Sequence, residues 1–507
     1  MLSDPIFTIE TRDGRVCADF PSCLAKLVDG SLLEFQGLAA HQRPAWLLFL
    51  YQTAALALVR SNHAALADDD AGWRTLADPA IWRGYLEALA PASAWELINP
   101  DPAAPALLQP PQGPGYTLLA STPDELDVLI TSKNHDIKRA RAAQATDADW
   151  LFALVSLQTM QAYSGRKSYG IARMSSRFAS RPLVERVPDR TVAAQFRHGV
   201  RAALTARMRA LVQPSLFSDN GVPLLWLVPW DGKQAFPIVH VDPLVVEICR
   251  RVRLVRDATG RITAFGQYSD TDRLAAPKEA KGNLGDAWTP IKADDDAALT
   301  VRENGFDYRL VSRLLNPKNF KLPVAATNTN PWLHLAVLAR STTETKTEGY
   351  HERWVRLPEG AREDDLGQIS ERMVEEAKAA KKALSMAVLT LLQGGPDKIN
   401  FGDERPAPWL AAAEGAIDGM FFQHLRARAE AEDVIAAHEA WKRELCAQMR
   451  GVLERAIDQG ISPPGLRRER ARAMAWARFE GMLQSAELKP ARQITAEPEE
   501  EFDDTLI

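Results

Sequence analysis

The sequence predicts an α+β protein in which a large mixed N-terminal domain is followed by a C-terminal four-helix bundle. Apolar and polar residues alternate at the start of the chain, as they do in half-buried strands. From residue 364 to 487, apolar residues instead recur every three or four positions, which is typical of amphipathic helices. The chain has 507 residues, too many for one ordinary domain. We therefore expect a mixed α/β domain over 1–360, the bundle over 361–487, and an acidic, disordered tail over 488–507.

Composition and charge narrow the class of protein. The net charge of −5 argues against a nucleic-acid binder with a basic surface all round, but it allows one basic face. The scattered cysteines include no C-x-x-C pair, so a zinc ribbon is not expected and a reducing cytoplasm is favoured. They are Cys17, Cys23, Cys249 and Cys446. The N-terminus does not look like a signal peptide, and the most apolar run, 45–59, is too short to span a bilayer. We therefore expect no membrane association.

The first 115 residues predict one hairpin, two helices and an irregular connection. Phe7, Ile9 and Val16 flank the turn at 12–15, which indicates a hairpin. Helices are expected over 44–61 and 79–89. Residues 99–115 are rich in proline and glycine and predict an extended, irregular segment.

The middle of the chain mixes helices and strands. Asp147 is expected to cap a helix from 148 to about 163, and a second helix is expected over 192–212. Residues 224–228, 238–241 and 252–255 are strand-like, and the turn at 257–260 predicts a hairpin. Short apolar runs at 335–339 and 354–357 predict another hairpin or an exposed loop.

Four stretches with helical periodicity follow, between residues 364 and 487. Glycine and proline interrupt the pattern at 394–396 and 462–465, where loops between bundle helices are expected. Six of the eight residues at 497–504 are acidic, which is typical of a disordered tail.

The most informative stretch is 151–182, where an apolar helix leads into a short loop with two glycines, Gly165 and Gly170. The chain from 166 to 181 carries five arginines or lysines and no acidic residue. A basic segment at the junction of a helix and a loop suits contact with phosphate and with a nucleic-acid groove. Arg173, Arg177 and Arg181 are expected to belong to this basic site.

Sequence motifs of common enzymes are missing. There is no H-E-x-x-H, G-x-S-x-G, G-x-G-x-x-G or EF-hand pattern, and no Lys-Ser/Thr follows Gly170 as a P-loop requires. The nine histidines are dispersed. We therefore expect no enzymatic activity, no metal and no cofactor. Two alternatives stay open: a nucleic-acid enzyme with a dispersed acidic metal site, and a pure scaffold whose basic loop binds only RNA.

The stretch 151–182, together with the residues before it, resembles the CasA family, the large subunit of the type I-E CRISPR surveillance complex, Cascade. Several further segments agree with the family in order. They are 95–98 with 107–109, the basic segment 241–254 that looks like a core strand, 287–292, and the C-terminal bundle. The resemblance covers nearly the whole chain.

The resemblance implies a non-enzymatic subunit that recognises the protospacer-adjacent motif (PAM) in double-stranded DNA. It also implies that the subunit helps to open the duplex so that guide RNA can pair. In such a system the protein reads a short motif and base pairing reads the rest. The partners implied are guide RNA, double-stranded target DNA, the other Cascade subunits and a helicase–nuclease.

The family's DNA-contacting positions can be carried over residue by residue. Gly165, Arg166 and Lys167 fall in the position of the loop that reads the PAM. This loop has fewer glycines and more charge than the family pattern, which favours phosphate contact; the alternative is an exposed basic turn. Lys292 is the candidate for the lysine that enters the minor groove, with Lys278 and Lys281 as alternatives.

Two further segments complete the implied sites. The wedge that helps to open the duplex would lie on the hairpin tip at 341–347, where its candidates are Thr343, Thr345 and Lys346. The polar, basic segment 131–141 matches the family's loop that reaches guide RNA and neighbouring subunits. Its candidates are Asn134, His135, Lys138, Arg139 and Arg141. Plain exposed loops are the alternative at both places.

Overall fold

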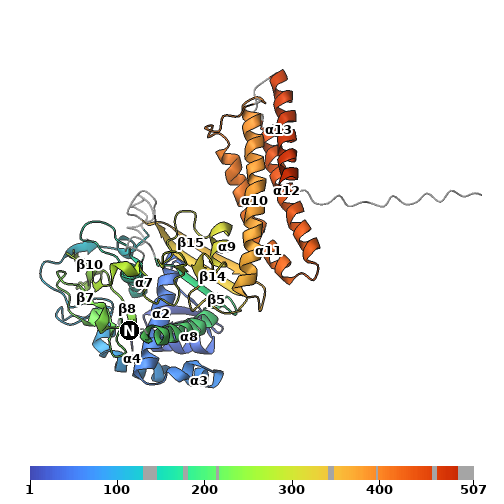
Figure 1. Cartoon of the computed structure of the whole chain (residues 1–507). Helices are drawn as coiled ribbons and strands as arrows, with labels where there is room; N and C mark the ends of the chain where they lie inside the picture. The colour runs from blue at the N-terminus through green and yellow to red at the C-terminus, as the bar shows by residue number, and fades with distance from the viewer. Residues whose placement is uncertain are drawn as a thin grey trace, which may run out of the picture. The chain divides into compact units, whose positions relative to one another are not determined.

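The computed structural model describes residues 1–129, 145–174, 181–212, 216–340, 347–395, 398–459 and 465–488. Contacts divide the chain into two compact units, Met1–Asp364 and Asp365–Ile507. The first unit mixes helices and strands, whereas the named elements of the second are all helices (Figure 1). The predicted α+β class is therefore confirmed.

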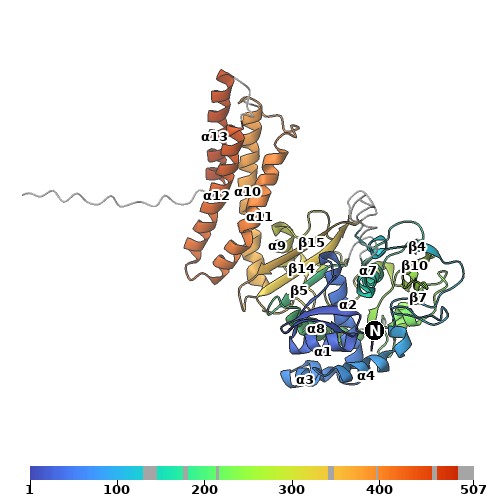
Figure 2. The same ribbon diagram turned by 180° about the vertical axis from the view of Figure 1, so that it is seen from behind.

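The N-terminal unit begins with a three-stranded sheet in the order β2-β1-β3, formed by β1 (Phe7–Thr11), β2 (Gly14–Ala18) and β3 (Leu32–Phe35). The predicted hairpin is confirmed, and Gly14 adopts the φ of +113° that its tight turn requires. Helix α1 (Phe20–Asp29), which the sequence did not predict, packs on α4 (Pro79–Leu89) and α8 (Val192–Leu211) (Figure 2). Asp19 caps it, accepting from Ser22 N at 2.9 Å.

Four longer helices build the core of this unit: α2 (Arg43–Arg60), α4 (Pro79–Leu89), α7 (Asp147–Met160) and α8 (Val192–Leu211). Trp46 of α2 meets Phe152 of α7 edge to face, with ring centroids 5.1 Å apart. The predicted helices are confirmed, but the predicted cap is wrong. The N-cap of α7 is Thr146, which exchanges hydrogen bonds with Asp149 in a capping box, so Asp147 lies inside the first turn.

A sheet in the order β15-β14-β5 lies beside α2 and α8 (Figure 1). It consists of β5 (Leu183–Val187), β14 (Trp332–Arg340) and β15 (Thr347–Arg356). The hairpin predicted for this region is confirmed by the antiparallel pairing of β14 and β15. His334 lies at the centre of the sheet, opposite Glu185 on one side and Trp354 on the other.

A further sheet, in the order β4-β10-β9, contains β4 (Thr117–Ala120), β9 (Arg251–Arg256) and β10 (Ile262–Gln267). The predicted hairpin at 257–260 is confirmed. Three strand predictions need correction. The segment 238–241 is mostly the 3-10 helix η6 (Ile238–His240), and 224–228 keeps only the end of β6 (Val222–Leu224) before η5 (Leu225–Leu227). The basic segment 241–254 is not one strand, because β8 (Val241–Val246) pairs with β6 while β9 pairs with β10.

Short elements complete the first unit. The helical ones are η1 (Ala40–Gln42), η2 (Ala64–Ala67), α3 (Asp70–Thr75), η3 (Ala92–Trp95), α5 (Pro123–Leu126), η7 (Lys278–Ala280) and α9 (Tyr308–Leu314). The strands are β7 (Phe236–Pro237), β11 (Leu274–Ala275), β12 (Ile291–Lys292) and β13 (Phe320–Lys321). Residues 99–115 hold no regular helix or strand, as their proline and glycine content predicts.

The second unit is the predicted four-helix bundle. Its helices are α10 (Glu363–Leu392), α11 (Ala407–Glu430), α12 (Val434–Asp458) and α13 (Leu466–Ser485). Met373, Ile417, Trp441 and Phe479, one from each helix, are fully buried. No helix in the described ranges is long and apolar enough to cross a bilayer. The predicted disordered tail lies outside the described residues, apart from Leu488.

Candidate nucleic-acid interface

The end of α7 is fixed by one amide side chain. Gln158 Nε2 donates to the carbonyls of Leu108 and Arg250 at 2.8 and 3.0 Å. Its Oε1 accepts from the backbone amides of Cys249 and Arg250 at 3.0 and 2.8 Å. All the strong hydrogen-bonding positions of this buried amide are therefore used. The place where the chain leaves α7 is tied to the segment that precedes β9.

The chain then forms a closed loop, residues 162–170, which we call the basic loop. Its neck is narrow, because Ile171 N donates to Gln161 O at 3.2 Å. A Cβ on Gly170 would lie 2.8 Å from backbone atoms of Ala162 and Tyr163, so only glycine fits there. At the tip, Ser168 N donates to Gly165 O at 2.9 Å.

The interior of the basic loop is occupied by the Arg250 guanidinium. It donates to the carbonyls of Tyr169, Ala162 (3.4 Å) and Ser168 (3.4 Å) and to the Ser164 hydroxyl (3.1 Å). One fixed cation therefore satisfies several carbonyls that a loop of this length would otherwise leave to water. The loop is held in one shape before any partner binds.

The outer surface of the basic loop presents Arg166 and Lys167. Arg166 is exposed, and it has no ion pair among the residues that the structure describes. Lys167 adopts a φ of +68°, and its amine pairs with Asp270 at 2.8 Å. The hydrogen bond and charge of Lys167 lower the pKa of Asp270, with smaller contributions from Lys233 and Arg166. Three cations thus lie around one carboxylate. Lys167 is paired with it, whereas the exposed Arg166 and Lys233 have no ion pair in the part of the chain that the structure describes and can meet an anion.

The next basic residue, Arg173, is not part of this surface, which corrects the sequence prediction. Its side chain is 3% exposed and pairs with Glu247 at 3.1 Å. It also donates to the carbonyl of Pro243 at 2.9 Å. Burial lowers the pKa of Arg173 and raises that of Glu247. This arginine stabilises the core and is unavailable to nucleic acid.

Arg181 is buried in the same way, so its predicted role is also wrong. It makes a bidentate contact with Asp286 at 2.7 and 2.8 Å, donates to Gln52 Oε1 at 3.1 Å, and lies over the Trp288 ring. Burial alone would raise the pKa of Asp286, but the Arg181 guanidinium holds that pKa below its ordinary value. Arg177 lies outside the described residues. The chain on both sides of 175–180 is therefore anchored by buried ion pairs.

The lysine candidates come from two segments of the chain, 278–281 and β12. Lys292 is on β12, and no hydrogen bond or ion pair joins it to the basic loop within the described ranges. Lys278 and Lys281 instead line a hollow of about 220 Å³ with Ala172 and Met174, on the chain that leaves the loop. Lys281 also contacts Asp295 at 3.4 Å. Lys292 N donates to Ala297 O at 2.9 Å and Ala298 N donates to Lys281 O at 3.1 Å, so both lysines border the same segment.

The remaining predicted contacts lie outside the described residues. They are Thr343, Thr345 and Lys346 between β14 and β15, and Asn134, His135, Lys138, Arg139 and Arg141 before α7. Their roles stay predictions.

Three parts of the interface, Arg250, Lys233 and Asp270, were not predicted from the sequence. They lie 60 to 110 positions downstream of the basic loop, and only the fold brings them to it. The turn-forming Asp-Gly at 231–232 was the one local signal available.

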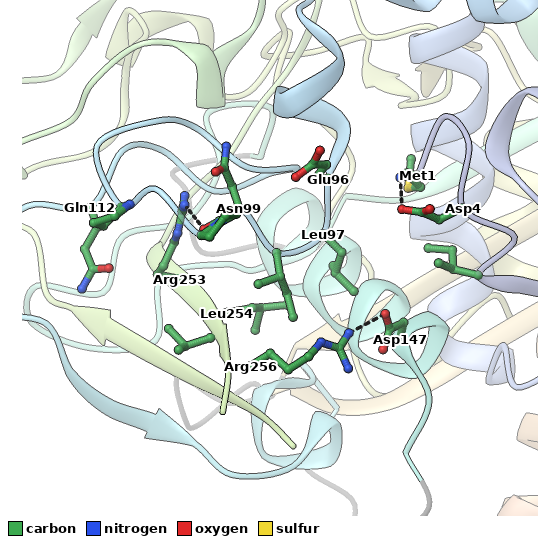
Figure 3. A pocket seen from close by; sticks show the side chains of 15 residues that line it. Met1, Asp4, Glu96, Leu97, Asn99, Gln112, Asp147, Arg253, Leu254 and Arg256 are labelled. Carbon is green, nitrogen blue, oxygen red and sulfur yellow. Dashed lines mark hydrogen bonds and ion pairs between the residues drawn. The ribbon is translucent and has the colours of Figure 1, made fainter. Parts of the chain in front are cut away.

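A larger hollow, of about 590 Å³, lies beside β9 (Figure 3). Its arginines already have partners: Arg256 pairs with Asp147 at 2.6 Å, and Arg253 donates to the carbonyls of Asn99 and Asp101 at 2.8 Å. The amine of Met1 likewise lies 3.7 Å from Asp4. Because these charges are paired internally, the hollow offers little to an anionic ligand. Across the described residues, no three His, Cys, Asp or Glu side chains gather as metal ligands would.

The fold of this chain is similar to that of several solved structures. Thermus thermophilus CasA (Cse1) is 16% identical with a TM-score of 0.64, over 96% of this chain and 98% of that one. Cse1 from Acidimicrobium ferrooxidans is 15% identical with a TM-score of 0.63, over the same shares. A chain of a CRISPR RNA-guided surveillance complex is 10% identical with a TM-score of 0.53, over 90% and 98%. The predicted resemblance is confirmed at the level of the fold. No family model and no curated protein sequence matches the chain.

Proposed function

We propose, from the fold that this chain shares with CasA and Cse1 proteins, that it is the large subunit of a type I-E CRISPR surveillance complex. In this role it recognises a PAM in double-stranded DNA and helps to open the duplex for guide-RNA pairing. The observation that carries the proposal is the basic loop, which Arg250 holds from within and which exposes Arg166 at its tip, next to the half-buried Gly165.

Preorganisation is the physical support for this role. A loop that is already ordered loses little conformational entropy when it binds, so more of the contact energy appears as affinity. Gly165 has a φ of +145°, and a Cβ added there would meet no atom within 4 Å, so a groove edge can approach the backbone closely. Arg166 supplies a cation for a phosphate. These features fit a duplex better than they fit a small metabolite.

The other implied contacts belong to the same proposal. Lys278, Lys281 or Lys292 enters the minor groove, and Thr343, Thr345 or Lys346 acts as the wedge. Asn134, His135, Lys138, Arg139 and Arg141 contact guide RNA or a neighbouring subunit. The partners are guide RNA, target DNA, the other Cascade subunits and a helicase–nuclease, and the subunit itself catalyses no reaction.

The test measures binding by the assembled complex to duplexes with and without a PAM over a salt series. We expect tighter binding with the PAM, and a salt dependence that becomes weaker by about one unit of slope when Arg166 is replaced by alanine. Equal affinity for both duplexes in the unmodified complex would refute PAM recognition. A salt slope unchanged by Arg166→Ala would refute the phosphate contact.

Two controls separate the alternatives. A scaffold should assemble and bind target DNA equally well with Gly165, Arg166 and Lys167 all replaced by alanine. A nucleic-acid enzyme should cleave DNA when the pure protein is given a divalent metal, and a single Asp or Glu substitution should abolish the cleavage.

A further inference from the structure

An unusually exposed aromatic ring lies beside the basic loop. Tyr268 directly follows β10, and the residue is 70% exposed. Within the described residues, the strongly exposed large apolar side chains include only one other aromatic, Phe401 at 71%, in the helical unit. Large rings left in water are a frequent mark of binding surfaces.

The backbone under this ring is held rigidly. Ser269 N donates to Lys167 O at 3.2 Å and Asp270 N donates to Gly232 O at 2.6 Å. The Tyr169 hydroxyl donates to Asp270 O at 3.0 Å. Segment 268–270 is therefore fixed to the basic loop and to the 231–234 turn, while the Tyr268 ring faces solvent. A rigid backbone with a free ring is the arrangement expected of a preformed stacking platform.

The charges around the ring are mainly positive and mostly exposed. Arg166, Lys167 and Lys233 all act on the carboxylate of Asp270, and Lys167 pairs with it directly. The other nearby acid, Asp231, is occupied by the backbone amides of Lys233 and Gln234, at 2.8 and 3.3 Å. An anionic chain with flat rings fits this combination of an aromatic face and cations.

We propose that Tyr268 stacks on an unpaired base next to the PAM, while Arg166 and Lys233 contact the adjoining phosphates. This inference rests on the proposed function, because the unpaired base would belong to the strand that is released when the duplex opens. The bases of an intact duplex are stacked on each other and offer no free face, so the ring selects unpaired nucleotides. Aromatic stacking tolerates any base, and a platform of this kind suits a target whose sequence varies.

The test compares two PAM-containing targets bound by the full assembled complex. One is a duplex cross-linked so that it cannot open, and the other carries a mismatched bubble adjoining the PAM. For Tyr268→Ala we expect a loss of affinity for the bubble target of about 5- to 150-fold, the range that stacking on one base represents. Affinity for the cross-linked duplex should stay within about twofold. Tyr268→Phe keeps the ring and should bind both targets as the unmodified complex does.

Phe401→Ala is the matched control, since it removes an equally exposed ring from the helical unit and should change neither affinity. An equal loss on both targets, or no loss on the bubble, overturns the stacking role. Failure of the Tyr268→Ala subunit to join the complex, with its unfolding temperature unchanged, also overturns it and indicates a protein contact. If the unmodified complex ignores the PAM, the proposed function fails, whereas the effect of Tyr268→Ala on bubble DNA is still measured.

Discussion

The basic loop and the chain that follows it use arginine in opposite ways. Arg166 is exposed at the loop tip, whereas Arg173 and Arg181 are 3% exposed and are paired with buried carboxylates. Fewer than twenty positions separate them in the sequence. A count of basic residues in a segment therefore does not identify a nucleic-acid surface. The partners, Glu247 and Asp286, lie far along the chain, and they decide which arginines remain free.

Other buried arginines of the same unit follow the structural pattern and bind backbone carbonyls. Arg186 donates to the carbonyls of Pro358 and Ala361, at 3.3 and 3.1 Å. Arg273 donates to those of Leu225 and Val228, at 2.8 and 2.7 Å. Five donors in one planar group allow a single side chain to hold an irregular segment. The unit's long connections are thus stabilised by internal cations.

The largest expected effect comes from breaking a buried pair. Arg181→Met leaves Asp286 without its partner and should lower the free energy of unfolding by about 3–5 kcal/mol, measured by chemical denaturation of the full chain. Arg166→Met is the matched control on the exposed side of the comparison and should stay within about 0.5 kcal/mol. The double change Arg181→Met with Asp286→Leu should recover most of the loss. Equal changes in the free energy of unfolding for the two single variants would contradict the distinction between buried structural arginines and the exposed arginine of the loop.

A smaller and more local effect is expected at Arg250, a structural arginine that holds the loop on which the exposed Arg166 lies. Arg250→Ala leaves several loop carbonyls without a donor and should cost about 1–3 kcal/mol. Hydrogen exchange of the amides of Ser168 and Ile171 should speed up more than exchange in the core of α8. Arg256→Ala, which removes the half-exposed pair with Asp147 and one hydrogen bond to the Gly260 carbonyl, both outside the basic loop, serves as the control. Unchanged exchange at Ser168 would mean that the loop keeps its shape without Arg250.

A buried histidine, His334, makes the stability of this unit depend on pH. His334 is 1% exposed, lies 3.1 Å from Glu185 and 2.9 Å from Glu352, and stacks on Trp354 at 4.0 Å. Burial alone would lower the pKa of His334, but hydrogen bonds to the two carboxylates raise it. Burial alone would raise the pKa of Glu352, but the hydrogen bond and charge of His334 lower it to about 2.

The raised pKa of His334 and the lowered pKa of Glu352 determine how the stability changes with pH. The stability that comes from His334 is fully present below its unfolded pKa of about 6.5 and is lost as the pH rises through the raised native value. The part that comes from Glu352 is present above its unfolded pKa of about 4.3 and is lost as the pH falls toward 2. His334→Gln should flatten the alkaline slope, which for one proton is at most about 1.4 kcal/mol per pH unit. The measurement is denaturation at several pH values, and an unchanged slope would contradict the assignment.

The smallest effect is expected at Lys167. Lys167→Gly relieves a left-handed backbone conformation while removing a surface ion pair, and the two changes should nearly cancel, to within about 0.5 kcal/mol. DNA binding by the complex should nevertheless become less salt-dependent by up to about one unit of slope. Lys167→Asn, which tolerates the same backbone, removes the charge alone. A large change in stability for either variant would place Lys167 with the structural arginines.

Periodicity and turn chemistry predicted most of the fold. Helices α2, α4, α7 and α8, the bundle and three hairpins are local patterns that one segment reveals by itself. Helix α1, with 10 residues, was not predicted, although its Asp19 cap and the proline in its first turn are both signals of a helix start. The strand predicted at 238–241 failed because a short apolar run suits a turn of 3-10 helix equally well.

The candidate site was predictable only in part, for a physical reason. Gly165, Arg166 and Lys167 could be recognised from one segment. The burial of Arg173 and Arg181, and the bonding of Arg250 to the loop, depend on contacts between residues 70 to 105 positions apart in the sequence. Long-range pairing of charges is the information that a single sequence does not display.

The narrow neck of the basic loop makes its tip an exchangeable part. Ile171, Gly170 and Gln161 close the loop at its base, and the tip at 165–167 contributes nothing to the apolar core. Insertions in a surface loop cost little once its ends are fixed, because closure entropy grows only slowly with length. New tip sequences can therefore be transplanted between residues 164 and 168 without rebuilding the protein. Under the proposed function, selection of such grafts offers a route to surveillance complexes with altered target choice.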